Sequence, residues 1–409
     1  MNIKIKLLSC ILALLLVLSL ASCNAPPETP TATPTEAPTE APTSTPTQKS
    51  TEKPTEASTE TQPPQIFSGE IKNIILIIGD GMGPEHIEGG QIFEGKTYDF
   101  TKWNGSFCNT DSLNPNGTVG KLTDSAASAT ALATGTLTLN SYLGKDKDGN
   151  DLYTIMDFAK SYDKSVGVVT TDYLYGATPS GFSAHSADRN DSETITLSQA
   201  KSGVNFLCGL KTSFYDDYAE TIQSNHYYYA NDLNDKNAIM EAEKVYLPVN
   251  IENSKSDSVD LKDVASLAIE YLDQDEDGFV LMIEQAHIDK YSHNNDIKGM
   301  LERVESLNET VEAVMEWMGD RTDTAVIVTA DHETGGLSVS REDKYSKFVR
   351  KGNTTLYYQW TDTNHSQTLV NIYVYGVNVD FKKISEYNKA DKIKNTDVFE
   401  IMLNILETY

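Results

Sequence analysis

Short apolar runs, each closed by small or polar residues, recur along most of the chain. The first is Ile74–Ile78, and similar runs lie at Val166–Val169, Phe279–Ile283 and Ala325–Val328. Runs of this length that are apolar throughout are typical of strands buried on both faces of a parallel sheet. A further strand is predicted over Leu369–Tyr375.

Helical patterns separate these predicted strands. Apolar residues recur at helical spacing over Leu261–Leu272 and Leu301–Met318, and a terminal helix is predicted over Asp397–Leu406. Strands that alternate with helices indicate an α/β fold, with a large, mostly parallel central sheet and helices on both faces. The Tyr- and Asn-rich stretch Tyr215–Tyr246 is predicted to be a surface insertion, with a solvated loop preferred over a substrate lid.

The N-terminus has the pattern of an export signal. Lys4 and Lys6 precede the apolar run Leu7–Leu20, which is short for a membrane span. The following Leu-Ala-Ser-Cys tetrapeptide resembles a bacterial lipobox, in which Cys23 is lipidated and becomes the mature N-terminus. An ordinary signal peptide with an incidental cysteine is the alternative. We therefore predict an exported, extracytoplasmic protein that is anchored to the cell membrane by lipid.

Three regions are predicted along the chain. Residues 1–22 form the lipoprotein signal peptide, and residues 23–65 form a linker dominated by Thr, Pro and Glu. Such a linker cannot bury a core and is expected to be disordered. Residues 66–409 form the predicted catalytic domain. Its two cysteines, Cys108 and Cys208, could form a disulfide in an exported protein, but two separate buried side chains are the preferred interpretation.

The 409-residue chain carries a formal net charge of −27. This charge argues against a nucleic-acid partner, because a phosphate backbone requires clustered Lys and Arg. An anionic substrate would therefore need local positive charge, which bound metal ions can supply.

Acidic and His residues gather where the predicted strands end. Asp80 follows the first strand, Glu284 ends the Phe279 strand, and Asp331 and His332 follow the Ala325 strand. One such carboxylate is often only a helix cap, but several strand ends together predict a metal site. Four other histidines lack this context and are interpreted as structural or surface residues: His86, His185, His226 and His287. Two acidic segments, 146–150 and 273–278, are interpreted as turns.

A second signal is the small-residue segment that starts at Thr123. Its composition predicts a tightly packed helix with Ser125 near the N-terminus, where free N–H groups and the helix dipole favour an anion. On this segment alone, a capping serine without catalytic function is the simpler interpretation.

Together these segments resemble the alkaline phosphatase family. The matching pieces occur in the family's order: NIILIIGDGMG from Asn73, TDSAASATALATG from Thr123, ATPSGFSAHSADR from Ala177, IEQAHIDKYSH from Ile283, TADHETGGL from Thr329, and His365 before a strand. The resemblance implies the family's α/β sandwich and hydrolysis of phosphate monoesters with two zinc ions and one magnesium ion. A phosphodiesterase or another hydrolase of the same superfamily is the alternative, and a non-enzymatic binding protein on the same scaffold is a more distant one.

The resemblance also implies roles for individual residues. Ser125 matches the nucleophile that becomes phosphoserine, Arg189 matches the phosphate-binding arginine, and Asp124 would orient that arginine. Lys290 matches a lysine that reaches phosphate through water. The implied metal ligands form three groups: Asp289, His293 and His365 for one zinc; Asp80, Asp331 and His332 for the other; Asp80, Thr178 and Glu284 for magnesium. A homodimer is also compatible with the resemblance.

The sequence departs from the family pattern at Gly176. Two residues before Thr178 the family usually carries Asp or His, which a glycine cannot replace. We expect this departure to weaken magnesium binding and to leave Lys290 without a carboxylate partner, so that product phosphate binds more tightly. Gly176→Asp is then expected to reverse both effects.

Overall fold

The computed structural model describes residues 71–230, 232–252, 258–387 and 392–408. The predicted signal peptide, Cys23 and the linker lie outside these residues. Among the helices that are described, none combines the length and the apolar character needed to cross a lipid bilayer.

A ten-stranded sheet forms the centre of the fold, and seven of its nine strand pairs are parallel. The two antiparallel pairs both involve β16. In spatial order the strands are β17 (Ile393–Lys394), β2 (Asn104–Asn109), β16 (Val370–Tyr375), β10 (Thr324–Thr329), β1 (Asn73–Gly79), β9 (Phe279–Gln285), β5 (Ser165–Thr170), β6 (Phe206–Leu210), β8 (Lys244–Val249) and β7 (Tyr227–Tyr229).

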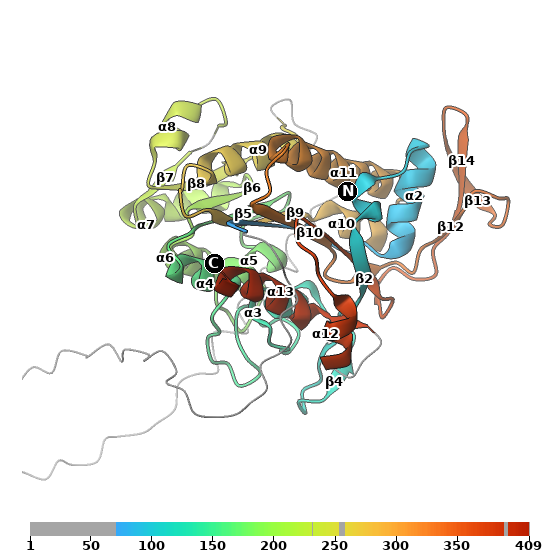
Figure 1. Cartoon of the computed structure of the whole chain (residues 1–409), viewed down its shortest axis with the longest axis horizontal. Coiled ribbons are helices and arrows are strands. Elements are labelled where there is room, and N and C mark those ends of the chain that lie inside the picture. The colour runs from blue at the N-terminus through green and yellow to red at the C-terminus, as the bar shows by residue number, and fades with distance from the viewer. Residues whose placement is uncertain (1–70, 231, 253–257, 388–391, 409) are drawn as a thin grey trace, which may run out of the picture. The chain divides into compact units, whose positions relative to one another are not determined.

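The central strands β1, β9 and β10 are buried along their whole length because helices cover both faces of the sheet. Figure 1 shows α9, α11 and α2 along one face and α3, α4, α5 and α13 along the other. The helices are α2 (Pro84–Glu94), α3 (Ser125–Thr134), α4 (Ile155–Ser161), α5 (Ala177–Ser183), α6 (Ser192–Lys201), α7 (Ala219–Ser224), α8 (Lys236–Glu241), α9 (Leu261–Leu272), α10 (His287–His293), α11 (Ile297–Met318), α12 (Phe381–Tyr387) and α13 (Asn395–Thr408). The predicted α/β fold is confirmed.

Shorter elements complete the described chain. They are the 3₁₀ helices η1 (Asp99–Lys102) and η2 (Ser213–Tyr218), and three small sheets: β3 (Ser112–Leu113) with β4 (Val119–Lys121), β11 (Glu333–Thr334) with β15 (His365–Ser366), and β12 (Ser338–Ser340) with β14 (Thr354–Gln359) and β13 (Lys347–Lys351). Both acidic segments interpreted as turns are turns, closed by backbone hydrogen bonds to Asp146 and Asp275.

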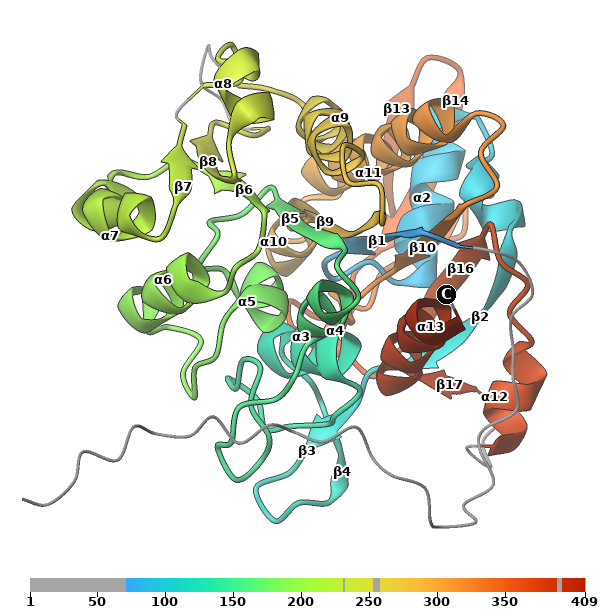
Figure 2. The same cartoon turned by 60° about the vertical axis from the view of Figure 1, so that its left-hand side comes forward.

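The preference for a solvated loop over Tyr215–Tyr246 is wrong. This stretch contains α7, α8, and two further parallel strands, β7 and β8, which extend the sheet beside β6 (Figure 2). Its tyrosines do not face water as a set, because Tyr215 and Tyr246 are fully buried and pack edge to face at 5.5 Å. The aromatic side chains therefore build a local core.

The two cysteines are not bonded to each other. Cys108 lies in β2 and Cys208 in β6, on strands separated by β16, β10, β1, β9 and β5, and both side chains are buried as free thiols. The preferred interpretation of two separate buried side chains is confirmed.

Candidate metal and phosphate site

Adjacent central strands deliver three carboxylates to one edge of the sheet. Asp80 follows β1, Asp331 follows β10, and Glu284 lies near the end of β9; β1 is hydrogen-bonded to both of the other strands. Because these strands are parallel, their carboxyl ends meet at the same edge. Acidic residues that are far apart in the sequence therefore lie close together in the fold.

Asp80, Asp331 and His332 form a fully buried cluster whose ligand atoms all lie within 4.8 Å of one another. His332 Nε2 is 3.2 Å from Asp331 Oδ2 and 3.5 Å from Asp80 Oδ1. Neither Asp80 Oδ1 nor Asp331 Oδ2 has a hydrogen-bond partner. Buried carboxylate oxygens without a donor are costly unless a cation binds them, so these residues fit a divalent metal ion.

Burial and mutual repulsion raise the pKa of the acids in this region. The pKa of Asp80 lies well above its usual range because of burial and the charges of Asp331 and Asp289. Burial likewise raises the pKa of Asp331 to about 7, with the Asp289 charge adding to it. For Glu284, burial raises the pKa to about 8, although a hydrogen bond from Thr170 lowers it. Several acids so close together can ionise at neutral pH only if a cation compensates their charge.

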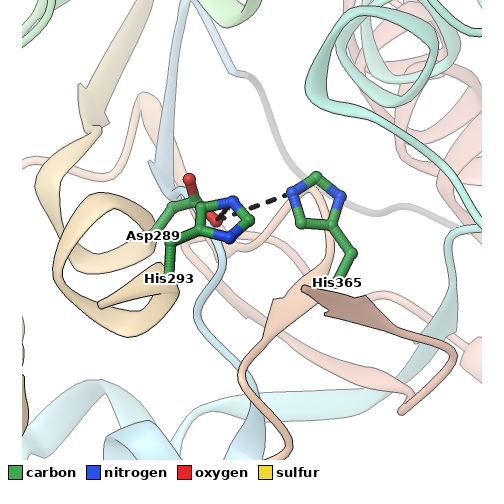
Figure 3. A group of neighbouring side chains, drawn as sticks. All are labelled: Asp289, His293 and His365. Carbon is green, nitrogen blue, oxygen red and sulfur yellow. Dashed lines mark ion pairs between the residues drawn. The ribbon is translucent and has the colours of Figure 1, made fainter. Parts of the chain in front are cut away.

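A second cluster, Asp289, His293 and His365, is more open to solvent (Figure 3). Asp289 and His293 lie one turn apart on α10, and His365 approaches from β15. Asp289 Oδ1 is 3.3 Å from His293 Nε2 and 3.7 Å from His365 Nε2. This donor set of one carboxylate and two imidazoles suits zinc.

Hydrogen bonds fix the orientation of both imidazoles in this cluster. His293 Nδ1 lies 2.5 Å from the Thr363 carbonyl oxygen, and His365 Nδ1 lies 2.9 Å from the Thr123 carbonyl oxygen. A carbonyl only accepts, so each Nδ1 must carry the proton and each Nε2 is left to face the cluster. Metal-binding histidines are commonly oriented in this way.

Thr334 links the two clusters, and sequence reasoning did not identify it. Its hydroxyl donates to Asp289 Oδ1 at 2.5 Å, so its oxygen is free to accept from His332 Nδ1 at 3.2 Å. His332 therefore also presents Nε2. The signal available in the sequence was the position of Thr334 two residues after His332, since alternate residues of an extended segment share a face.

His86 supports the helix that carries two of these ligands. Its Nδ1 accepts from the Gly83 N–H at 3.2 Å, so Nε2 donates to Ser292 Oγ, which in turn donates to the Ile288 carbonyl. Burial lowers the pKa of His86 to about 4 and keeps it neutral. The interpretation of His86 as structural agrees with this geometry, although its place beside α10 could not be read from the sequence.

Ser125 lies at the N-terminus of α3, beside the buried cluster. Its Oγ is 3.2 Å from His332 Nε2, and its side chain is buried. Asp124 caps the helix by accepting from the Ala127 N–H at 3.0 Å, and its other carboxylate oxygen accepts from Arg189 Nη1 at 3.1 Å. The same aspartate thus orders the helix start and holds the guanidinium.

Thr178, in the first turn of α5, lies close enough to Glu284 to help lower its pKa. Within ordinary hydrogen-bond geometry, however, its buried Oγ1 has no partner. Glu284 in turn interacts with Asp80 through its charge. The Thr178 hydroxyl and these two carboxylates offer only oxygen donors, which suit magnesium.

The expectation of an unpaired Lys290 is wrong. Lys290 Nζ donates to Asp172 Oδ1 at 2.5 Å, and about half of the lysine side chain is exposed. Asp172 lies four residues before Gly176, outside the position where the family pattern places a charged residue, so the motif comparison did not reveal it.

Comparisons with known proteins agree with this architecture. The sequence model of the alkaline phosphatase family matches residues 71–211 and 231–404. Alkaline phosphatase 3 of Bacillus subtilis is 31% identical over 299 residues, which cover 68% of this chain and 64% of that protein. The alkaline phosphatase of Escherichia coli is 30% identical over 355 residues, which cover 69% of this chain and 74% of that protein.

Solved structures show the same fold. The alkaline phosphatase of the Antarctic bacterium TAB5 superposes with a TM-score of 0.71 at 24% identity, covering 84% of this chain and 99% of that one. The family match spans most of the described residues and includes both ligand clusters and the Ser125 helix. The chain belongs to the alkaline phosphatase family.

Proposed function

We propose that this protein hydrolyses phosphate monoesters through a phosphoserine intermediate on Ser125 and releases inorganic phosphate. The observation that carries the proposal is the position of Ser125, whose Oγ lies at a helix N-terminus and 3.2 Å from a nitrogen of the buried ligand cluster. Family membership supports the same reaction.

Two zinc ions and one magnesium ion are the proposed cofactors. The cluster Asp289, His293 and His365 would hold one zinc ion, and Asp80, Asp331 and His332 would hold the other. Asp80, Thr178 and Glu284 would hold magnesium, because only oxygen atoms are available there. When bound, the paired ions would stabilise negative charge on the attacking and leaving oxygens of an in-line displacement.

The protein's own groups hold the phosphate and supply the nucleophile. Arg189, fixed by Asp124, presents parallel N–H donors that match two phosphate oxygens. Ser125 Oγ then attacks phosphorus as its proton passes to water. The P–O bond to the substrate's alcohol breaks, and the departing alkoxide takes up a proton from water. Water attacks the phosphoserine in the second step, which returns Ser125 to its hydroxyl form and releases phosphate.

A phosphodiesterase or another hydrolase of the superfamily is the alternative activity. Arg189 favours the monoesterase, since a monoester dianion offers more unsubstituted oxygens to a guanidinium fork than a diester does. Removal of this fork should therefore impair monoester hydrolysis more than diester hydrolysis.

The test is the rate of 4-nitrophenol release from 4-nitrophenyl phosphate and from bis(4-nitrophenyl) phosphate, with zinc and magnesium added, for wild type and Arg189→Ala. We expect the wild type to prefer the monoester and Arg189→Ala to lose most of that preference. A wild type that prefers the diester would overturn the proposed function.

The resemblance also supports a homodimer and, with the lipobox, an extracytoplasmic protein anchored through a lipid on Cys23. Light scattering of the purified domain tests the first of these proposals. A monomeric mass at micromolar concentration would contradict it.

A further inference from the structure

The space beside Gly176 is already filled. A Cβ atom at this position would lie 2.8 Å from the Tyr173 carbonyl oxygen and 3.0 Å from Asp172 Oδ2. The backbone of Gly176 has φ −58° and ψ 160°, which other residues adopt readily. Glycine is therefore needed here for room and not for conformation, and the carboxylate of Asp172 lies against the vacant Cβ position. This crowding also argues against the expected benefit of Gly176→Asp.

Asp172 is held firmly in this place. Its N–H donates to Thr170 Oγ1 at 2.9 Å, and that hydroxyl in turn donates to Glu284. Its carbonyl oxygen accepts from the Leu210 N–H at 2.6 Å, and its carboxylate accepts from Lys290 Nζ. The side chain is only 21% exposed. One residue thus connects Glu284, a proposed magnesium ligand, with Lys290, for which the resemblance implies a place near phosphate.

The charge of Asp172 reaches the all-oxygen site. Thr170 Oγ1 accepts from the Asp172 N–H and donates to Glu284, so the two acidic residues are neighbours. A negative charge that close to Glu284 also attracts any cation bound by Glu284, Thr178 and Asp80. Carboxylate oxygens favour a hard ion such as magnesium over zinc.

We propose that Asp172 is a positioning residue that takes over the task of the side chain missing at position 176. Its carboxylate strengthens magnesium binding at Asp80, Thr178 and Glu284, and it holds Lys290 so that the ammonium group is only partly available to phosphate. This proposal deepens the proposed function and rests on the metal sites assigned there and on the place near phosphate that the resemblance implies for Lys290.

Asp172→Asn tests the first half of the proposal, because it keeps the shape and removes the charge. Magnesium is titrated into the zinc-loaded protein by calorimetry, and the magnesium content is measured after dialysis. We expect the magnesium dissociation constant to rise about tenfold, within the range seen when a supporting partner of a metal ligand is lost. Asp99→Asn is the matched control, because Asp99 also accepts from a lysine, Lys102, at 2.6 Å. Asp99 lies in η1, just before β2 in the sequence, and four strands separate β2 from β5 in the sheet.

Binding of inorganic phosphate tests the second half. With its partner removed, Lys290 should attract phosphate more strongly, so Asp172→Asn should bind phosphate roughly threefold more tightly, the scale of a partly exposed ion pair. In a Lys290→Ala background, Asp172→Asn should leave phosphate affinity unchanged but still weaken magnesium binding. Unchanged phosphate affinity together with weaker magnesium binding would distinguish a charge effect from a general loosening of the segment around Asp172.

Gly176→Ala gives an independent check with Asp172 intact. The added methyl group should displace the Asp172 carboxylate and therefore weaken magnesium binding, as Asp172→Asn is expected to do. Magnesium affinity that is the same in wild type, Asp172→Asn and the Asp99→Asn control would overturn the proposal. A further outcome is that the wild type hydrolyses no monoester while Asp172→Asn still binds magnesium more weakly than the wild type does. That result would contradict the proposed function but not the role of Asp172 in magnesium binding.

Discussion

The two ligand clusters lie side by side, yet they differ in origin and burial. Asp80, Asp331 and His332 extend from central strands, and their side chains are at most 10% exposed. Asp289, His293 and His365 extend from α10 and β15, outside the main sheet, and their side chains are 11 to 37% exposed. The rings of His332 and His365 stack at 3.5 Å, where the clusters meet.

Because of this difference in burial, the pKa values of the aspartates shift in opposite directions in the two clusters. Burial and the charges of neighbouring acids raise the pKa of both aspartates in the buried cluster. In the open cluster, burial acts on Asp289 too, but hydrogen bonds and histidine charges lower its pKa overall, and its hydrogen bond raises the pKa of His293 to about 9. The buried cluster therefore needs a cation to become fully ionised, whereas the open cluster is already balanced as an ion pair.

The largest effect is expected from Asp331→Asn. This change removes one of the two carboxylate charges from the buried cluster without changing its shape, so a bound cation would be stabilised less. Monoester hydrolysis should fall by more than the roughly 100-fold that loss of a supporting partner costs. Metal analysis should show less zinc than in the wild type. Unchanged zinc content would show that Asp331 is not a ligand.

Thr334→Val should impair both clusters together. The variant keeps the side-chain volume but removes the donor to Asp289 and the acceptor for His332. We expect zinc affinity to fall about 10- to 100-fold, as measured by competition with a chelator. Thr334→Ser retains the hydroxyl and should stay near wild type. If Val and Ser behave alike, the hydroxyl does not position the ligands.

The pH dependence of the metal-free protein tests the electrostatic contrast. Between about pH 7 and 9, folded Asp331, Glu284 and His293 bind more protons than the unfolded chain, because their folded pKa values of about 7, 8 and 9 lie above the ordinary ones. Stability must then fall as pH rises through this window. Buried histidines with a lowered pKa increase stability as pH rises, but only until the histidines of the unfolded chain are neutral too, which is nearly complete at about pH 7.

The measurement is thermal unfolding in a chelator at about pH 7 and pH 8.5, repeated with zinc and magnesium. We expect a lower melting temperature at the higher pH without metal, and a larger gain from metal there, because metals bind the deprotonated ligands. A metal-free protein that becomes more stable across this window would contradict the raised pKa values.

The smallest effect on catalysis is expected from Cys23→Ala, far from both clusters in the sequence. The variant should move the protein from the membrane fraction to a soluble or unprocessed form, while specific activity stays unchanged. Cell fractionation with activity assays checks both parts. A wild type found wholly in the soluble fraction would refute the lipid anchor.

The sequence predicted the central features because they depend on local patterns. β1, β9 and β10 each have an apolar core of at least four residues, so their bounds differ by only one or two residues from the predicted ones, and α9 has the predicted bounds. The edge strands escaped prediction, because β7 has only three residues and β17 only two. The tyrosines around β8 were predicted to lie on a solvated surface, but Tyr215 and Tyr246 are buried and their rings pack against each other.

The candidate site divides in the same way. The structure brings Asp80, Asp331 and His332 together, and likewise Asp289, His293 and His365. Most of these residues could be grouped from the sequence because they follow a strand or share a helical turn with another ligand. The roles of Thr334, His86 and Asp172 were not identified, since their contacts join segments that are far apart in the sequence and meet only in the folded chain. Gly176 was noticed as a departure, but the sequence could not show that Asp172 occupies the adjoining space.

The central claim is that Ser125, placed where the buried cluster meets the N-terminus of α3, is the nucleophile. The direct measurement is to quench the zinc- and magnesium-loaded enzyme with acid during turnover of a phosphate monoester and to map covalent phosphate by mass spectrometry. We expect phosphate on Ser125 in the wild type and none in Ser125→Ala. Phosphate on another residue, or the same signal in Ser125→Ala, would contradict the account.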